Sequence, residues 1–544
     1  MSRKSPKENV AQKMSFEDFK RSILNDYRLA CESRETSLLG RKEVLTGKAK
    51  FGIFGDGKEV AQIAMAKVFQ DGDFRSGYYG DQTFMFATGT LNLQQWFAGL
   101  YAHTDIEQEP MSGGRQMGGH FATRSLNEDG SWKDLTKIKN SSSDISPTGS
   151  QMPRLLGLAL ASKHYRLNPD LHSSSFEKFS RRGNEIAFGT IGDASTSEGL
   201  FWETMNAAGV MQVPMLVSVW DDGYGISVPK RYQTTKESIS EALSGFQRTA
   251  EKKGFQILKT KGWDYPHLIE TYEKAAKICR EEHVPVLVHV EEVNQPQGHS
   301  TSGSHERYKT PERLQWEHDF DCVRKFRNWI ESAGLATAAE LDTIEATAKE
   351  NVRTQRRAAW DAYLAPINTD LQEAVSILDK LIAESANATL ISKVKEDLVS
   401  KSDASRKDIH AAIRLALRHT RAENISSKKE AIDWLHTNTG ANHTRYSSTL
   451  HSGTALDVKP VTVEYGEEKL YDGREVLRDN FDAILTKYPE VMIFGEDSGF
   501  IGGVNQGLEG LQKKFGEIRV FDTGIREATI TGQAIGVAMR GLRP

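Results

Sequence analysis

Two short apolar runs, separated by a helical stretch, form the clearest hydrophobic pattern of the chain. The first covers 186–191 and ends at Gly192-Asp193, and the second covers 215–220 and ends at Asp221-Asp222-Gly223. Apolar runs bounded by turn residues predict a strand, a helix and a second strand of a parallel sheet. Ligands bind outside the carboxyl ends of such strands, so the two acidic turns are expected to face one site.

The wider pattern divides the chain into four regions. A polar tail and an amphipathic helix are expected over 1–45. Alternating Gly-rich turns, helical runs and strand-like runs predict an α/β domain over 46–310, with a parallel sheet flanked by helices. A helical region with a linker follows over 311–464, and a second α/β domain is expected over 465–544.

The two helical regions have local signals of their own. In the first, apolar residues recur at helical spacing, namely at Phe16, Phe19, Ile23 and Tyr27. In the second, 336–349 and 371–382 show charged amphipathic patterns, and Thr337 with Glu340 predicts a capping box. The Thr-, Asn-, His- and Ser-rich stretch 437–452 predicts the linker. We expect solvated structural helices here and assign them no chemistry.

Composition limits the classes of function. The 544 residues are 38% hydrophobic, carry a formal net charge of −4 and include three cysteines without metal or redox spacing. With a pI near 6.5, charge gives no case for binding nucleic acid or an anionic membrane. Unpaired cysteines are typical of a reducing cytoplasm. Residues 1–14 lack an apolar signal core and no long apolar run occurs, so we expect neither export nor anchoring.

The acidic turns predict a magnesium site. Magnesium binds few protein carboxylates and completes its coordination with phosphate oxygens and water, which makes a diphosphate the natural partner. A lone Gly-Asp turn is more often only a turn. Here Asp193 and Asp222 are separated by a complete helix and strand, a pattern that resembles the thiamine diphosphate fingerprint. That fingerprint has an Asn where this chain has Asp222, and a carboxylate can replace the amide as an oxygen ligand.

Other segments extend this resemblance along the chain. The chain resembles a fusion of the α and β chains of the thiamine diphosphate-dependent, decarboxylating component of 2-oxoacid dehydrogenase complexes. The α-like motifs lie at 114–120, 146–153, 188–208 and 298–303, and the β-like motifs lie at 494–497 and 519–527. Each motif is moderately specific, whereas their order along one chain is highly specific.

The resemblance implies a role for each matching residue. Asp193, Asp222 and the backbone carbonyl of Tyr224 would hold magnesium. The cofactor would lie against a set of pocket residues, with the helix after Asp193 offering free amides to the diphosphate. That set is Tyr79, Ser146, Thr148, Gly192, Asp193, Ala194 and Asp222.

Three residues are implied in catalysis. Glu527 would hydrogen-bond the aminopyrimidine ring and promote formation of the reactive carbanion, although an isolated Glu is usually only a surface charge. His120 and His299 would transfer protons, because histidine titrates near neutrality. A lone histidine is usually structural, so their flanking Gly-rich motifs carry this assignment.

The chain departs from the family pattern at a few positions. Gly80 stands where the family has an arginine that helps to bind the diphosphate, and Gln295 replaces a second basic residue. Both changes remove positive charge from an anion site, so cofactor affinity is expected to fall unless Arg75 or Arg115 compensates. By the same resemblance the second α/β domain is incomplete, because the sequence ends roughly eighty residues into the β-like part. We therefore expect either a truncated gene product or a fragment of a longer chain.

The expected activity is oxidative decarboxylation of a 2-oxoacid with acyl transfer to a lipoylated acyltransferase. The run Gly114-Arg-Gln-Met before His120 resembles branched-chain members of the family more than pyruvate members. We therefore expect a branched-chain substrate such as 3-methyl-2-oxobutanoate, with pyruvate as the alternative. In the family the two half-sites meet across subunits, so a homodimer is expected. The contrasting hypothesis is a catalytically incomplete subunit that binds cofactor or serves assembly.

Overall fold

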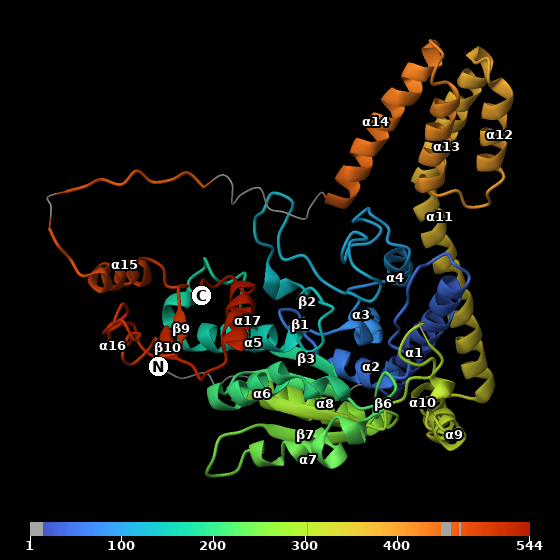
Figure 1. Cartoon of the computed structure of the whole chain (residues 1–544). Helices are drawn as coiled ribbons and strands as arrows, with labels where there is room; N and C mark the ends of the chain where they lie inside the picture. Colours follow the sequence, from blue (N-terminus) through green and yellow to red (C-terminus); the bar gives the residue numbers. More distant parts are fainter. Residues whose placement is uncertain (1–14, 302, 448–457, 467–468) are drawn as a thin grey trace, which may run out of the picture.

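The computed structural model describes residues 15–301, 303–447, 458–466 and 469–544. A parallel sheet with helices on both faces forms the centre, a helical extension projects from one side, and a small α/β part lies on the other (Figure 1). The predicted N-terminal tail and the end of the predicted linker lie outside the described residues. Among the described helices, none combines the length and apolar character needed to cross a bilayer.

The central sheet has six parallel strands in the order β2-β1-β3-β4-β8-β7. Their bounds are β1 Phe74–Ser76, β2 Asn140–Ser141, β3 Ala187–Gly192, β4 Met215–Trp220, β7 Gln256–Lys261 and β8 Val286–Glu291. The two strands predicted from the apolar runs are β3 and β4, which pair in parallel with Gly192 opposite Trp220. A small antiparallel hairpin, β5 Tyr224–Gly225 with β6 Val228–Pro229, follows β4.

Both faces of the sheet are buried, as parallel sheets require. Phe188 and Leu216 point into one apolar cluster with α2 (Glu59–Val68) and α8 (Tyr265–Lys277). Their strand neighbours Ile191 and Val217 point into a second cluster with α5 (Gln151–Leu167) and α6 (Gly199–Met211). The strands are therefore apolar on both sides, which explains why they read as continuous hydrophobic runs rather than alternating ones.

Shorter helices and a long first helix complete this part. The short helices are α3 Gln82–Ala87, α4 Leu93–Leu100 and α7 Ile239–Ala242. Helix α1 spans Phe16–Leu45 and is capped by Ser15. The predicted apolar stripe of α1 is right in its second half, where Ile23 and Tyr27 are buried. It is wrong in its first half, because Phe16 is 63% exposed.

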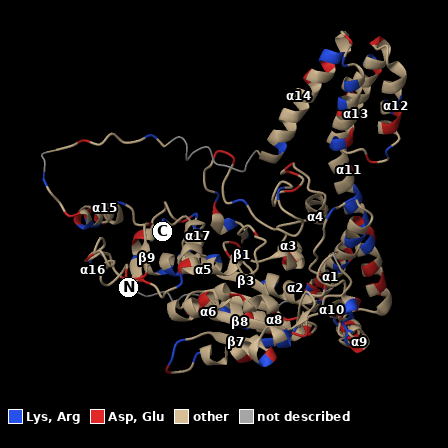
Figure 2. Cartoon of the chain, viewed as in Figure 1, with Lys and Arg blue, Asp and Glu red and all other residues tan. Residues whose placement is uncertain are grey.

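The helical extension has its own apolar core. Helices α9 (Pro311–Asp319) and α10 (Cys322–Ser332) lead into α11 (Ala338–Glu384), whose end packs with α12 (Ala388–Val399), α13 (Arg406–His419) and α14 (Ser426–Ser447). The predicted capping box is confirmed at the start of α11. Charges of both signs follow these helices (Figure 2), as expected for solvated faces.

The linker predicted from residue 437 is wrong over its first part, where α14 continues to Ser447. Asn438 is buried in the helix, donates to Asp370 Oδ1 over 3.0 Å and contacts His410 Nε2 through its own Oδ1 at 2.6 Å. These tertiary contacts stabilise a helix that local composition disfavours.

The C-terminal part contains two parallel strands and three helices. They are α15 Gly473–Lys487, β9 Ile493–Gly495, α16 Leu511–Phe515, β10 Val520–Asp522 and α17 Glu527–Ala538. Helix α17 packs along α5, where Gly157 and Gly536 face each other closely. A buried ion pair between Arg540 and Glu185 (2.9 Å) joins the same two parts.

Candidate active site

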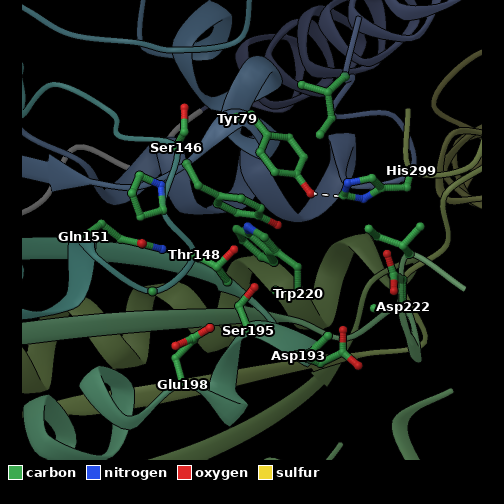
Figure 3. Close-up of a pocket in the computed structure, with 18 of the residues that line it drawn as sticks. Tyr79, Ser146, Thr148, Gln151, Asp193, Ser195, Glu198, Trp220, Asp222 and His299 are labelled. Atoms are coloured by element: carbon green, nitrogen blue, oxygen red, sulfur yellow. Dashed lines mark hydrogen bonds between the residues drawn. The ribbon is translucent and has the colours of Figure 1, made fainter. Parts of the chain in front are cut away.

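A cavity of about 510 Å³ opens at the carboxyl ends of the central strands. Five neighbouring strands contribute to it through the loops that follow them: β2, β1, β3, β4 and β8. The parallel arrangement is the reason, because it brings residues distant in sequence to one edge of the sheet. Figure 3 shows Asp193 and Asp222 on one side of the cavity, with Ser146 and Gln151 on the other.

The structure brings together all but one of the sequence-predicted site residues. Those that line the cavity are Tyr79, His120, Ser146, Thr148, Gly192, Asp193, Ala194, Asp222, Tyr224 and His299. Glu527 does not line it. It is exposed at the first position of α17, beside α6, where Thr529 Oγ1 donates to Glu203 Oε2.

The acidic turns carry the strongest electrostatic signal of the site. Asp193 is buried, and its Oδ2 has no hydrogen-bond partner among the residues that the structure describes. Burial raises the pKa of Asp193 well above its ordinary value, and the nearby carboxylates of Asp222 and Asp221 raise it further. Clustered carboxylates with an unsatisfied oxygen suit a divalent cation, which would reverse this shift.

Asp221 has partners of its own. His289 Nε2 lies 3.0 Å and Lys230 Nζ 3.1 Å from Asp221 Oδ2. Burial opposes ionisation, yet these two partners hold the pKa of Asp221 below its ordinary value. Its backbone also continues the pairing with β8, because Asp221 N–H donates to the Val290 carbonyl over 3.0 Å. Asp221 therefore anchors the turn, and Asp222 faces the cavity.

No group of three or more His, Cys, Asp or Glu side chains forms a metal-binding cluster within the described part of the chain. The ligand set expected from the sequence contains only two carboxylates, Asp193 and Asp222, together with the carbonyl of Tyr224. That composition suits magnesium, which takes few protein ligands and retains water and phosphate oxygens.

The two histidines are held in different ways. His120 Nδ1 lies 3.0 Å from the Met117 carbonyl, which can only accept, so Nδ1 carries the proton. Nε2 therefore accepts from the Ser146 hydroxyl at 2.9 Å. His299 Nδ1 lies 3.4 Å from the Tyr79 hydroxyl. Burial lowers the pKa of His299, an effect that Asp222 opposes and Lys58 reinforces.

The sequence left open whether Arg75 or Arg115 compensates for the lost positive charge. Arg75 is fully buried and is held by Asp81 and Asp144, at 2.6 and 2.9 Å, outside the cavity lining. Arg115 donates instead to backbone carbonyls, including that of Arg445 at 2.6 Å, and also lies outside the lining. Neither residue supplies the missing cation.

Several cavity residues escaped the sequence reasoning. Lys58, Tyr78, Gln151, Glu198 and Trp220 all line the cavity. The sequence holds only a partial indication of two of them, because Lys58 follows the Gly55-Asp56-Gly57 turn and Glu198 lies within the fingerprint segment. Only the folded arrangement assigns them to one site, because they come from separate loops.

Comparison with known proteins agrees with this architecture. The family described as "Dehydrogenase E1 component" matches residues 34–367, and "Transketolase, pyrimidine binding domain" matches 470–544. The 2-oxoisovalerate dehydrogenase subunit alpha of Bacillus subtilis is 25% identical over 327 residues, which cover 59% of this chain and 86% of that protein.

The second matched region has relatives among β subunits. The pyruvate dehydrogenase E1 component subunit beta of Acholeplasma laidlawii is 49% identical over 70 residues, 13% of this chain and 21% of that protein. The 2-oxoisovalerate dehydrogenase subunit beta of Pseudomonas aeruginosa is 47% identical over 70 residues, 13% of this chain and 20% of that protein. The chain thus spans about a fifth of the length of these β-subunit relatives. Since the first match covers more than half of its residues, the chain belongs to the dehydrogenase E1 component family, with a transketolase-type pyrimidine-binding region following on the same polypeptide.

Proposed function

We propose that the chain acts in the thiamine diphosphate-dependent oxidative decarboxylation of a 2-oxoacid, with transfer of the acyl group to a lipoyl group. The observation that carries this proposal is the cavity at the ends of β3 and β4, where the unpartnered carboxylate oxygen of Asp193 lies near the carboxylate of Asp222. The same cavity lies within the region that matches E1 components.

Magnesium and thiamine diphosphate fit the residues present. Asp193, Asp222 and the Tyr224 carbonyl would hold the metal, and Ser146, Thr148 and Tyr79 would line the cofactor pocket, together with Gly192 and Ala194. When bound, the cofactor supplies the nucleophilic carbon and the electron sink for decarboxylation. In this proposal residues 46–310 form the metal and cofactor domain, and 465–544 form the pyrimidine-binding domain; 1–45 and 311–464 are structural.

The two histidines are suited to moving protons within the cavity. The Ser146 hydroxyl donates to His120 Nε2, so this nitrogen is the basic atom on the cavity side and can take up a proton. The lowered pKa of His299 keeps its imidazole neutral near pH 7, ready to accept a proton. The Tyr79 hydroxyl beside His299 would orient that ring.

Glu527 would complete the site from a second copy of the chain. Within one chain this residue is exposed and lies outside the cavity lining. The neighbouring Ile525 is 83% exposed, an apolar side chain that a partner surface would cover. We therefore propose a homodimer in which each α-like cavity faces the Glu527 of the other chain.

For the substrate we propose a branched-chain 2-oxoacid such as 3-methyl-2-oxobutanoate, with pyruvate as the alternative. The sequence before His120 and the 2-oxoisovalerate dehydrogenase relatives support the first, and the pyruvate dehydrogenase relative supports the second. The proposed partner is the lipoylated acyltransferase of the complex. All three cysteines are buried free thiols, which supports a cytoplasmic location.

Calorimetry of thiamine diphosphate binding, with and without magnesium, tests the site. Binding is expected to require magnesium, to be lost in Asp193→Asn and to persist in Glu527→Gln. Asp129→Asn serves as a matched control, because Asp129 lies on an exposed loop away from the cavity. Magnesium-independent binding, or full binding by Asp193→Asn, would refute the metal assignment.

Carbon dioxide release from 3-methyl-2-oxobutanoate, with an artificial electron acceptor, tests turnover. Release that is lost in Glu527→Gln supports the dehydrogenase reading. If the chain binds the cofactor but releases no carbon dioxide from 3-methyl-2-oxobutanoate or from pyruvate, it is a catalytically incomplete subunit instead.

A further inference from the structure

Apart from two histidines, the described residues that line the cavity include one basic side chain, that of Lys58. Lys58 is only 4% exposed, and its Nζ lies 3.8 Å from Asp222 Oδ2. This separation is an ion pair but exceeds hydrogen-bond length, so the ammonium retains donors for another acceptor. A buried lysine with spare donors in a polar cavity points to a ligand with negative charge.

The position of Lys58 is fixed by its backbone. Gly57 has φ +88°, and a Cβ there would lie 1.9 Å from the Asn294 carbonyl oxygen, so only glycine fits this turn. On the other side, Glu59 accepts from Gly57 N–H over 2.8 Å and pairs with Arg34 over 2.8 Å. The lysine stem therefore starts from a rigid turn at the beginning of α2.

Acidic side chains outnumber lysine and arginine in the cavity lining. Asp193, Asp222 and Glu198 contribute three carboxylates to the lining, against one lysine. An Asn at position 222 would offer one donor nitrogen and one acceptor oxygen, whereas Asp222 offers two acceptor oxygens and a negative charge. Its Oδ1 accepts from Tyr224 N–H over 3.1 Å, and Lys58 is the ionic partner of Oδ2.

The backbone at Gly80 leaves no room for a basic side chain at that position. A Cβ on Gly80 would lie 2.7 Å from Tyr78 Cζ and 2.8 Å from its hydroxyl oxygen. The Tyr78 ring thus occupies the space that a longer side chain at position 80 would need. With Arg75 held by Asp81 and Asp144, the only lysine or arginine among the described lining residues is Lys58.

We propose that Lys58 is the diphosphate-binding cation of this site, an inference that rests on the proposed function. Without metal, its ammonium neutralises Asp222. With metal and diphosphate bound, Asp222 would ligate the metal and the Lys58 ammonium would donate to a diphosphate oxygen. Lys58 and Asp222 thus form a charge-compensated pair that replaces a neutral amide and an arginine.

The test compares Lys58→Met and Lys58→Arg with the wild-type chain in two binding measurements. Mn²⁺ binding to the cofactor-free protein reports the charge beside Asp222. Calorimetry at saturating Mg²⁺ reports the affinities for thiamine diphosphate and thiamine monophosphate. Lys380→Met is the matched control, because Lys380 also pairs with a carboxylate, that of Glu430 at 2.7 Å, but lies in the helical extension and outside the cavity lining.

Opposite changes are expected in Lys58→Met. Mn²⁺ should bind about three- to tenfold more tightly, because a positive charge near the carboxylate is gone. Thiamine diphosphate should bind about ten- to a hundredfold more weakly, because a charged hydrogen bond to phosphate is lost. The preference for diphosphate over monophosphate should shrink in Lys58→Met. Lys58→Arg should retain most of this preference, and Lys380→Met should leave it unchanged.

Other outcomes overturn the inference. If Lys58→Met bound Mn²⁺ and thiamine diphosphate more weakly by equal factors, the lysine would only support the fold. Diphosphate affinity within twofold of wild type would mean that it does not contact the ligand. If wild type itself binds no thiamine diphosphate, the proposed function fails and the diphosphate role of Lys58 with it, while Mn²⁺ binding still decides whether Lys58 opposes a cation at Asp222.

Discussion

Replacing Gly157 by alanine should loosen the contact that joins the two matched regions. At this point α5 and α17 approach through glycines on both helices. A Cβ on Gly157 would lie 2.0 Å from the Gln533 carbonyl oxygen and 2.9 Å from Gly536 Cα. Ordinary carbon-to-oxygen contacts are roughly 3.3 Å or more, so the helices would have to separate by about 1 Å.

The magnitude follows from two opposing effects. Overpacking against a rigid backbone costs about 1–3 kcal/mol, whereas replacing a helical glycine by alanine gains about 1 kcal/mol. The sum is a net loss of up to about 2 kcal/mol in the free energy of unfolding. Gly440→Ala in α14 is the matched control. Its Cβ would meet no atom of the described part of the chain within 4 Å, so only the gain of about 0.5–1 kcal/mol remains.

Urea unfolding followed by circular dichroism measures both variants, and limited proteolysis reports release of 470–544. Gly157→Ala should unfold at lower urea than wild type and lose the C-terminal part more readily, whereas Gly440→Ala should unfold at higher urea. Equal stabilisation of the two variants would show that the close approach of α5 and α17 does not hold in solution.

Three further perturbations concern polar side chains. Arg540→Met should cost about 3–5 kcal/mol in urea unfolding, because it leaves Glu185 buried without its partner; a loss below 1 kcal/mol would contradict a desolvated pair. Thr337→Ala should cost about 1 kcal/mol through loss of the α11 cap, and restoration by Thr337→Ser would confirm the cause. Burial lowers the pKa of His164 from 6.5 to about 4, so the unfolded state binds its proton first as pH falls. Stability should therefore decline by roughly 3 kcal/mol between pH 6.5 and 4, less in His164→Gln; an unchanged pH profile in that variant would exclude His164.

Local patterns determined a large share of the fold. Both strands around Asp193 and Asp222 read as continuous apolar runs because each is buried on two faces, and the turns that follow them are marked by glycine. The Thr337 capping box was equally readable, since it involves only backbone and side chains three residues apart. The parallel sheet then followed from connectivity, and with it the meeting of the two acidic turns.

Tertiary structure decided what depends on distant contacts. Residues 437–447 are helical because Asn438 is held by Asp370 and His410, which no local signal reveals. Whether Arg75 supplies positive charge to the cavity was also a tertiary question, because this side chain is buried between two aspartates and lies outside the cavity lining.

Lys58 and Glu527 show the same limit within the candidate site. The first lies in the cavity beside Asp222, and the second lies outside the cavity lining of its own chain. Sequence specifies residue types and local geometry, whereas the identity of a charged group's neighbours depends on packing between segments far apart in the chain. For this protein, residue patterns were enough to indicate the family, the two strands β3 and β4 and ten of the residues that line the cavity. Which cation faces the carboxylates depended on the packing of distant segments, because Lys58 and Asp222 come from different loops.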